Sequence, residues 1–132
     1  MKFSVNLSTV FTEYPFLHRF EKAKEFGFSY VECQFPYDFD VEDIKGKLEE
    51  HSLSLVLINL PPGNWDKGER GLAADPNRQK DFLSSVEQGI FYAKALNVKN
   101  IHCMAGLAAS GSEEIYIENV RMAARMLAEE NL

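Results

Sequence analysis

Four short apolar runs alternate with four segments of helical periodicity along this chain of 132 residues. Each run is expected to form a β-strand, and each following segment a helix, because its apolar residues recur at intervals of three or four. Such alternation predicts a parallel sheet with right-handed crossover connections. The expected strands cover residues 2–6, 29–34, 53–59 and 99–104, and the expected helices begin near Pro15, Asp40, Arg78 and Ser112.

The ends of the expected helices carry residues suited to those positions. Pro15 fits a first helical turn, and Asp40 and Ser112 can cap helix N-termini. Gly27 is predicted to stop the first helix in the left-handed conformation, and Asn97 to terminate the third. The residues expected to face inward are Phe16, Phe20, Ala23 and Phe26, then Val41, Ile44 and Leu48, then Phe82, Val86, Ile90 and Ala93, and finally Tyr116, Val120, Ala123 and Leu127.

The third strand is apolar throughout residues 55–58, so it is expected to be covered on both faces. Two α/β architectures fit such strands: a small open doubly wound sheet, or half of an eight-stranded (β/α)8 barrel, which takes about 250 residues. The turn after the first strand, residues 7–11, contains no glycine-rich phosphate cradle. This absence disfavours a nucleotide-binding open sheet. Either architecture makes residues 1–132 a single domain.

Composition and charge limit the possible partners and location. The chain has 45% hydrophobic and 26% charged residues, which is ordinary for a globular protein, and a formal net charge of −6. Without clustered Lys and Arg, neither a nucleic acid nor a membrane is an expected partner. No apolar run reaches the length of a membrane span and no leader pattern is present, so a cytoplasmic location is expected. Cys33 and Cys103 lie in apolar strands and are expected to be reduced and structural.

Polar residues stand at the carboxyl ends of the expected strands, where parallel α/β folds bind ligands. These residues are Asn6, Glu32 with Gln34, Asn59 and His102. Each alone is equally consistent with a hydrogen-bonded strand end that stabilises a loop, but together they converge on one rim. His102 is the strongest candidate because an imidazole can donate to a substrate carbonyl or carboxylate near neutral pH. The other two histidines, His18 and His51, are expected on helix surfaces, and no metal-ligand spacing is present.

The longest irregular segment, residues 60–77, is rich in Pro, Gly, Asn and Asp. Loops of this length are uncommon and often functional. Residues 61–69, which include Trp65, are predicted to form a lid over the strand ends that excludes water. The alternative is a surface loop anchored by its tryptophan.

Short motifs after all four strands give the chain a family resemblance. They are Asn6-Leu7-Ser8, Phe35-Pro36-Tyr37, Pro61-Pro62-Gly63, Lys67-Gly68-Glu69 with Gly71-Leu72, Tyr92-Ala93-Lys94-Ala95-Leu96 and His102-Cys103-Met104-Ala105-Gly106. In this order and spacing the chain resembles the hydroxypyruvate isomerase family of xylose-isomerase-like TIM barrels, which also include sugar epimerases and an endonuclease branch. The resemblance implies the N-terminal half of a (β/α)8 barrel, with about four βα units. The connection at residues 107–114 is shorter than is usual in the family.

The resemblance implies a proton-transfer isomerase that interconverts hydroxypyruvate and tartronate semialdehyde through an enediolate. A carboxylate base and a divalent cation, Mg²⁺ or Mn²⁺, would serve this chemistry. In the family these groups follow the fifth and later strands, so the catalytic residues are expected beyond Leu132. No catalytic or metal-binding residue is assigned within residues 1–132, Glu129 and Glu130 included.

This chain alone is therefore expected to be inactive and to bind no metal. It is expected to supply one wall of the pocket for a small hydroxy or keto acid or a sugar. The substrate-binding candidates are His102, Asn6, Asn59, Glu69, Phe35 and Tyr37.

Other functions remain open on the same scaffold. The chain could belong to another sugar isomerase or epimerase, because these enzymes share the same general chemistry. It could also be a half-barrel binding protein without catalysis, while an endonuclease function is disfavoured by the acidic charge. The unpaired edges of a half barrel predict self-association.

Overall fold

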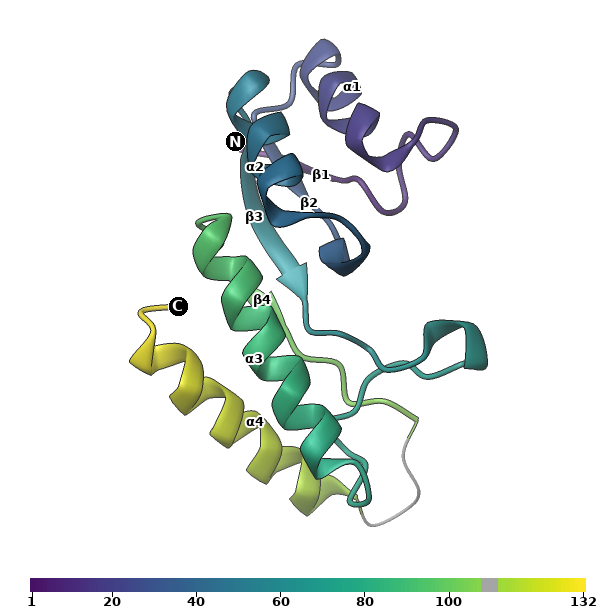
Figure 1. Ribbon diagram of the computed structural model, residues 1–132, viewed down its shortest axis with the longest axis vertical. Coiled ribbons are helices and arrows are strands. Elements are labelled where there is room, and N and C mark those ends of the chain that lie inside the picture. Colours follow the sequence, from purple (N-terminus) through teal and green to yellow (C-terminus); the bar gives the residue numbers. More distant parts are fainter. Residues whose placement is uncertain (108–111) are drawn as a thin grey trace.

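The computed structural model describes residues 1–107 and 112–132, and in these ranges four strands alternate with four α-helices and three short 3₁₀ turns (Figure 1). Every expected strand and helix is present, which confirms the predicted βα repeat. The elements are β1 (Ser4–Asn6), η1 (Phe16–His18), α1 (Arg19–Glu25), β2 (Tyr30–Glu32), η2 (Pro36–Asp38), α2 (Val41–Glu50), β3 (Ser54–Asn59), η3 (Trp65–Lys67), α3 (Gln79–Ala95), β4 (Ile101–His102) and α4 (Glu113–Glu129).

The four strands form one parallel sheet in the order β1-β2-β3-β4, as the sequence predicts. Val5 pairs with Val31, Val31 with Leu55, and Asn59 with His102. β1, β2 and β4 are shorter than the apolar runs that predict them. The register between β2 and β3 shifts after Val31: Val31 pairs with Leu55 and Glu32 with Leu57, so Val56 is an extra residue in β3, as in a β-bulge. Each strand pairs with the strand that comes next in the sequence, which is how the strands of a (β/α)8 barrel are arranged.

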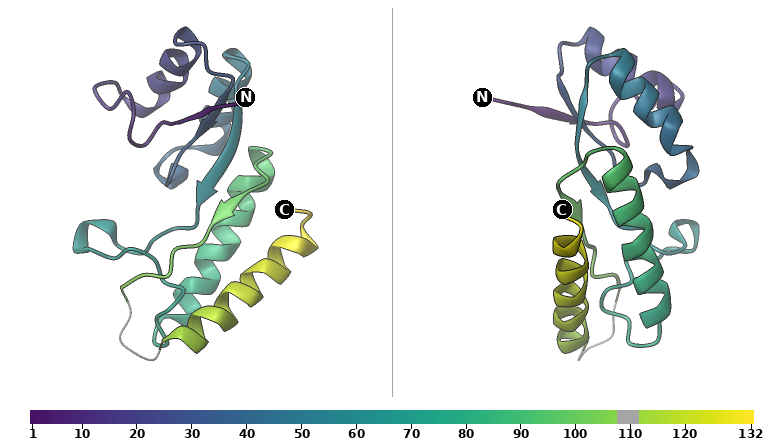
Figure 2. Two further views of the ribbon diagram at one scale, coloured as in Figure 1. Left: turned by 180° about the vertical axis from the view of Figure 1, so that it is seen from behind. Right: turned by 60° about the vertical axis from the view of Figure 1, so that its left-hand side comes forward.

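The helices pack on one face of this sheet. Seen from behind, in the left view of Figure 2, β3 and β4 lie in front of α3. The core between the layers contains the fully buried side chains of Leu7, Phe20, Val31, Ile44 and Ile58. Within residues 1–107 and 112–132, no helix covers the opposite face of the sheet.

The uncovered face corrects one expectation for β3. Leu55 and Ile58 are buried, but Val56 and Leu57 are only partly buried. The continuous apolar run indicated burial on both faces; only the helix-facing side is packed within the described chain. β3 is thus apolar on a face that no element of residues 1–107 or 112–132 covers.

Most of the predicted helix ends are confirmed. Gly27 has a φ of 84° and Asn97 a φ of 54°, the left-handed conformation that ends a helix. The Asp40 side chain accepts a hydrogen bond of 2.9 Å from the Glu42 N–H and caps α2. Pro15 precedes η1 rather than α1, so the first helix opens with a 3₁₀ turn. Ser112 lies at the N-cap position of α4, and its carbonyl accepts from Tyr116 N–H.

Three inward-facing expectations are wrong in detail. Phe26 follows the end of α1 and is 71% exposed, with its ring 5.4 Å from that of Phe11. On α4 the fully buried residues are Asn119 and Ala123, whereas Val120 and Leu127 are partly exposed, because the helix packs on its neighbours along a slightly rotated face.

His18 is exposed as expected, but the His51 side chain is only 16% exposed. None of the described helices is long and apolar enough to cross a bilayer.

Leu132, which follows α4, is part of the packed framework. Its N–H donates to the carbonyl oxygen of Leu127 at 3.0 Å. Its side chain is partly buried and packs against the same core that contains Ile58 and Val98. The turn after α4 therefore folds back toward the sheet.

Candidate functional site

A hydrogen-bonded polar cluster occupies the carboxyl ends of β1 and β2. The Asn6 side chain accepts from the Ser8 N–H at 2.9 Å and donates to Glu32 Oε1 at 3.2 Å. Glu32 Oε2 accepts from the Ser4 hydroxyl at 3.2 Å. The main chain therefore fixes the orientation of the Asn6 amide, and the carboxylate of Glu32 lies at the centre of the cluster.

Asn59 and Tyr37 hold the end of β3 in place. Asn59 is 4% exposed and its amide donates to the Met104 sulfur at 3.9 Å. The Tyr37 hydroxyl donates to the main-chain oxygen of Asn59 at 2.5 Å, and its ring lies edge-on to Tyr92. Burial raises the pKa of the Tyr37 phenol well above its ordinary value, so this group stays protonated. These contacts make both residues part of the framework beneath the rim.

His102 lies at the carboxyl end of β4. Its main-chain oxygen accepts from the Leu60 N–H at 2.9 Å, which joins the end of β4 to the residue after β3. The imidazole is exposed, and within the described chain it makes no hydrogen bond. Of the predicted contacts, His102 is therefore the one whose polar atoms are free to meet a ligand.

An aromatic pocket opens between the ends of β2 and β3. It has a volume of about 490 Å³ and is lined in part by Phe35, Tyr37 and Trp65. The rings of Phe35 and Trp65 are 5.1 Å apart, and Trp65 is 41% exposed. This contact brings the segment after β3 against the segment after β2, at the rim where the sequence predicts a lid; closure of such a lid stays a prediction.

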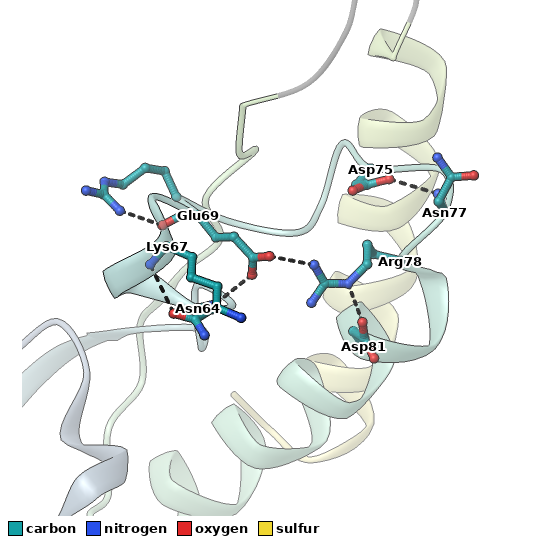
Figure 3. A network of polar contacts seen from close by, with 8 residues as sticks. Asn64, Lys67, Glu69, Asp75, Asn77, Arg78 and Asp81 are labelled. Carbon is teal, nitrogen blue, oxygen red and sulfur yellow. Dashed lines mark hydrogen bonds and ion pairs between the residues drawn. The ribbon is translucent and has the colours of Figure 1, made fainter.

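A charged network connects this same segment to the start of α3. Glu69 Oε1 accepts from Arg78 Nη1 at 2.8 Å, and Glu69 Oε2 accepts from the Asn64 N–H at 2.5 Å. Figure 3 shows Glu69 between Asn64 and Arg78, with Arg78 also directed to Asp81. The hydrogen bond from Arg78, followed by that from Asn64 N–H, lowers the pKa of Glu69 below its ordinary value. Each oxygen of Glu69, a predicted substrate contact, thus already accepts one hydrogen bond within the protein.

A second pocket, of about 230 Å³, lies beside this network. Its charged lining residues are Lys67, Glu69, Arg70, Asp75 and Arg78, and its lining also contains glycines. The segment after β3 and the segment after β4 cross there through an antiparallel bridge between Gly71 and Ala105. The pocket therefore joins the ends of two neighbouring strands.

The six predicted substrate contacts do not share one cavity within the described chain. Phe35 and Tyr37 line the aromatic pocket and Glu69 lines the charged one. Asn6 pairs with Glu32, Asn59 lies beneath the rim, and His102 is exposed at the end of β4.

Sequence reasoning left Arg70 and Arg78 out of the candidate site. The signal that could have found them is two arginines among the Gly, Asn and Asp residues of the long loop, since fixed guanidinium groups suit anionic ligands. Part of the connection that was expected to be short, residues 108–111, lies outside the described residues.

The site's remaining reactive side chains favour structural roles. Burial raises the pKa of the Cys33 thiol to about 12 and that of Cys103 to about 11, which keeps both thiols protonated. No group of three or more His, Cys, Asp or Glu residues in the described ranges is arranged to hold a metal ion. The groups that could contact a ligand are the Asn6 amide, the His102 imidazole and the Glu32 carboxylate. Two guanidinium groups join them: among the described residues, Arg78 is paired with carboxylates, and Arg70 is not.

The catalytic residues expected beyond Leu132 lie outside this sequence, so that expectation stays a prediction. Leu132 itself offers no polar side chain and packs against the core. Glu129 ends α4 and is exposed, and the exposed Glu130 pairs with Lys94 of α3. These contacts support surface and framework roles for the residues at the end of α4.

Comparison with known proteins extends these observations to a family. The profile described as "Xylose isomerase-like TIM barrel" matches residues 20–132. The hydroxypyruvate isomerase of Escherichia coli K12 is 47% identical over the whole chain, and the 2-oxo-tetronate isomerase of Haemophilus influenzae is 40% identical over 92% of it. The chain covers 53% and 49% of these two proteins, so it spans about half the length of the curated relatives it matches.

Solved structures show the same relationship. A protein described as AP endonuclease, family 2, from Brucella melitensis superimposes with a TM-score of 0.95 at 45% identity, over 99% of this chain and 52% of that one. D-allulose 3-epimerase from Methylomonas sp. superimposes with a TM-score of 0.74 at 14% identity, over 100% of this chain and 49% of that one. The similarity to the epimerase concerns the fold alone. In both superpositions the four βα units of this chain match about half of a longer chain.

Proposed function

Because this chain belongs to the xylose isomerase-like TIM-barrel family, we propose that it forms one wall of the active site of a hydroxypyruvate isomerase. The observation that carries the proposal is the 47% identity to the Escherichia coli enzyme along the whole chain. The parallel order β1-β2-β3-β4 supports it, because this order brings Asn6, Glu32, Asn59 and His102 to the ends of adjacent strands.

The proposed reaction moves a carbonyl group between two neighbouring carbons of a three-carbon acid. A proton leaves C3 of hydroxypyruvate to give an enediolate. The hydroxyl proton then passes from O3 to O2, and a proton adds to C2 to give tartronate semialdehyde. In this reaction His102 would donate a hydrogen bond to the oxygen that becomes negative, since its imidazole has no partner within the described chain. The Asn6–Glu32 pair would accept from and orient a substrate hydroxyl.

The base and the divalent cation are proposed to come from outside this half of the barrel, beyond Leu132. A Mg²⁺ or Mn²⁺ ion would supply positive charge to stabilise an oxygen that becomes negative. The described residues do not fit such an ion, because they contain no cluster of three potential ligands. The role of this chain is thus to bind and orient the substrate.

The alternative functions differ from this proposal in the substrate that the protein binds or converts. An isomerase or epimerase acting on another sugar or oxo acid would use the same wall of the barrel, and a binding protein would retain it without turnover. A nucleic-acid substrate is disfavoured by the net charge of −6, although one solved relative is described as an endonuclease. The cytoplasm is the proposed location.

A fusion of this chain to the second half of the Escherichia coli relative tests the proposal. With Mg²⁺ or Mn²⁺ added, we expect the fusion to convert hydroxypyruvate and the chain alone to be inactive. His102→Gln should lower kcat/KM of the fusion by about tenfold or more, because one hydrogen bond to the developing charge is lost. The control His18→Gln, on an exposed helix position, should leave it unchanged.

Two results would contradict parts of this proposal. Turnover by the chain alone would show that its own residues supply the base. An active fusion that prefers a ketose over hydroxypyruvate would favour the sugar epimerase alternative.

We also propose that the isolated chain associates with a second copy of itself. β1 and β4 are the two edge strands of the sheet, and the sheet face opposite the helices is uncovered within the described residues. Both features favour association, because unpaired backbone groups and apolar surface gain by being covered.

A further inference from the structure

The pocket beside Glu69 contains an arginine that is held rigidly but has no anionic partner in the described chain. We infer that Arg70, in a pocket that Lys67 also lines, binds the carboxylate of the substrate and selects oxo acids over uncharged sugars. The inference deepens the proposed function and rests on it for the identity of the acid. Hydroxypyruvate carries one carboxylate, and none of the neutral rim residues can neutralise it.

The guanidinium of Arg70 is fixed by main-chain and aromatic contacts. Its Nη1 donates to the carbonyl oxygens of Trp65 at 2.9 Å and Glu69 at 2.8 Å. Its central carbon lies 3.7 Å from the centroid of the Trp65 ring. Carbonyls and an aromatic face orient a cation without cancelling its charge. Arg70 is therefore ready for an anion before one arrives.

Arg78 shows the contrasting situation in the same pocket. Its guanidinium pairs with both Glu69 and Asp81, so two carboxylates already neutralise it. Arg70 and Lys67 form no ion pair with any described residue, and residues 108–111 include no acidic side chain. Asp75 also lines this pocket, and Lys67 contributes to the lowered pKa of Glu69, so Arg70 is the pocket's guanidinium that has no carboxylate partner among the described residues.

The size and position of the pocket suit a small acid. Its volume of about 230 Å³ is below the range of about 300–1,000 Å³ usual for drug-sized ligands. Gly68, which also lines it, has nothing within 4 Å of an added Cβ, so the pocket is open at this residue. The pocket also lies where the segments after β3 and β4 cross, on the carboxyl side of the strands that end in Asn59 and His102.

Calorimetric titration of the chain with hydroxypyruvate, and with uncharged dihydroxyacetone, tests the inference. We expect hydroxypyruvate to bind at least about tenfold more tightly, and Arg70→Gln to remove about tenfold of that affinity without changing the weak binding of dihydroxyacetone. Arg70→Lys keeps the charge but loses the planar fork, so its loss should be smaller. Arg121→Gln, on the exposed face of α4, is the matched control and should change neither value.

The single tryptophan locates the bound acid. Trp65 stacks on Arg70, so its fluorescence should change on titration with hydroxypyruvate but not with chloride at equal ionic strength. No binding by the unmutated chain, or an unchanged dissociation constant in Arg70→Gln with native circular dichroism, would overturn the inference. If Arg70→Gln does not fold, Arg70→Lys is measured instead. An affinity of Arg70→Lys for hydroxypyruvate equal to that of the unmutated chain would also overturn the inference.

Measurements on the fusion separate this inference from the proposed function. If the fusion turns over hydroxypyruvate but Arg70→Gln leaves KM unchanged, the carboxylate site is wrong and the isomerase function stands. If binding depends on Arg70 but the fusion has no isomerase activity, the carboxylate site stands and the proposed reaction fails.

Discussion

Two glycines at the crossing of the rim segments are required by the space available. Gly71 has a φ of 126°, and a Cβ added to it would lie 2.3 Å from the main-chain oxygen of Met104. Gly106 has a φ of 96°, and its added Cβ would lie 2.2 Å from the oxygen of Gly71. The obstacles are main-chain atoms, which cannot move aside as a flexible side chain can. These two residues therefore let the segments after β3 and β4 form one wall of the charged pocket.

Gly71→Ala should lower the free energy of unfolding by about 2 kcal/mol or more, because the alanine is strained and clashes with the opposing main chain. Gly46→Ala is the control, since Gly46 lies inside α2 with nothing within 4 Å of an added Cβ. That substitution should raise the stability by up to about 1 kcal/mol through helix propensity. Urea unfolding followed by circular dichroism measures both. Equal effects of the two changes would show that the crossing is not tightly packed.

At the scale of elements, side-chain contacts connect the long rim segment to the helices. The pair formed by Glu69 and Arg78 holds the segment containing η3 to the start of α3. On the other side, the buried Asn119 of α4 donates to the carbonyl oxygen of Ala73 at 2.8 Å. The segment that carries Trp65 and Arg70 is thus fixed by contacts with two helices.

The ion pair of Glu69 predicts a loss of order in acid. The pKa of Glu69 is lowered from its ordinary value of 4.5, so its contribution is fully present above that pH and is lost as pH falls through the lowered value. Trp65 fluorescence should therefore change as the pH falls below about 4.5. In Glu69→Gln, where the titrating group is gone, the fluorescence should already differ at neutral pH and this acid transition should be absent. An identical acid transition in both proteins would assign it to another group.

At the scale of the whole molecule, the chain is one wall of a barrel with an exposed inner face. Ser4, Asn6 and Glu32 place polar groups on the two strands at one end of the sheet, while Val56 and Leu57 of β3 leave apolar surface partly open. The mixture of hydrogen-bonded polar groups and apolar residues suits the lining of a barrel better than a solvent-exposed surface.

Sedimentation velocity should detect a dimer of the isolated chain at micromolar concentrations. We expect association because the edge strands β1 and β4 carry unpaired backbone groups and the inner face is apolar in part. The dimer fraction should rise with concentration. A folded monomer over the whole concentration range would contradict self-association, while the family assignment would remain.

Local residue chemistry was sufficient to predict the order and type of the elements. Helix ends at Gly27, Asp40 and Asn97 depend on backbone conformation and hydrogen bonds within a few residues, so a short stretch of sequence determines them. The order of polar strand ends was equally readable, because parallel strands place their carboxyl ends on the same side. The sequence by itself thus determined a βα wall with a polar rim.

Only the tertiary structure decided which rim residues meet and which are already occupied. Glu69 looked available in sequence, but Arg78 and the Asn64 N–H occupy its two oxygens, while Arg70 next to it has no carboxylate partner in the described chain. The burial of Asn119 and the open face of β3 were likewise not visible in periodicity. The physical reason is that such contacts depend on how two distant segments cross and how the sheet twists, and no local pattern encodes either.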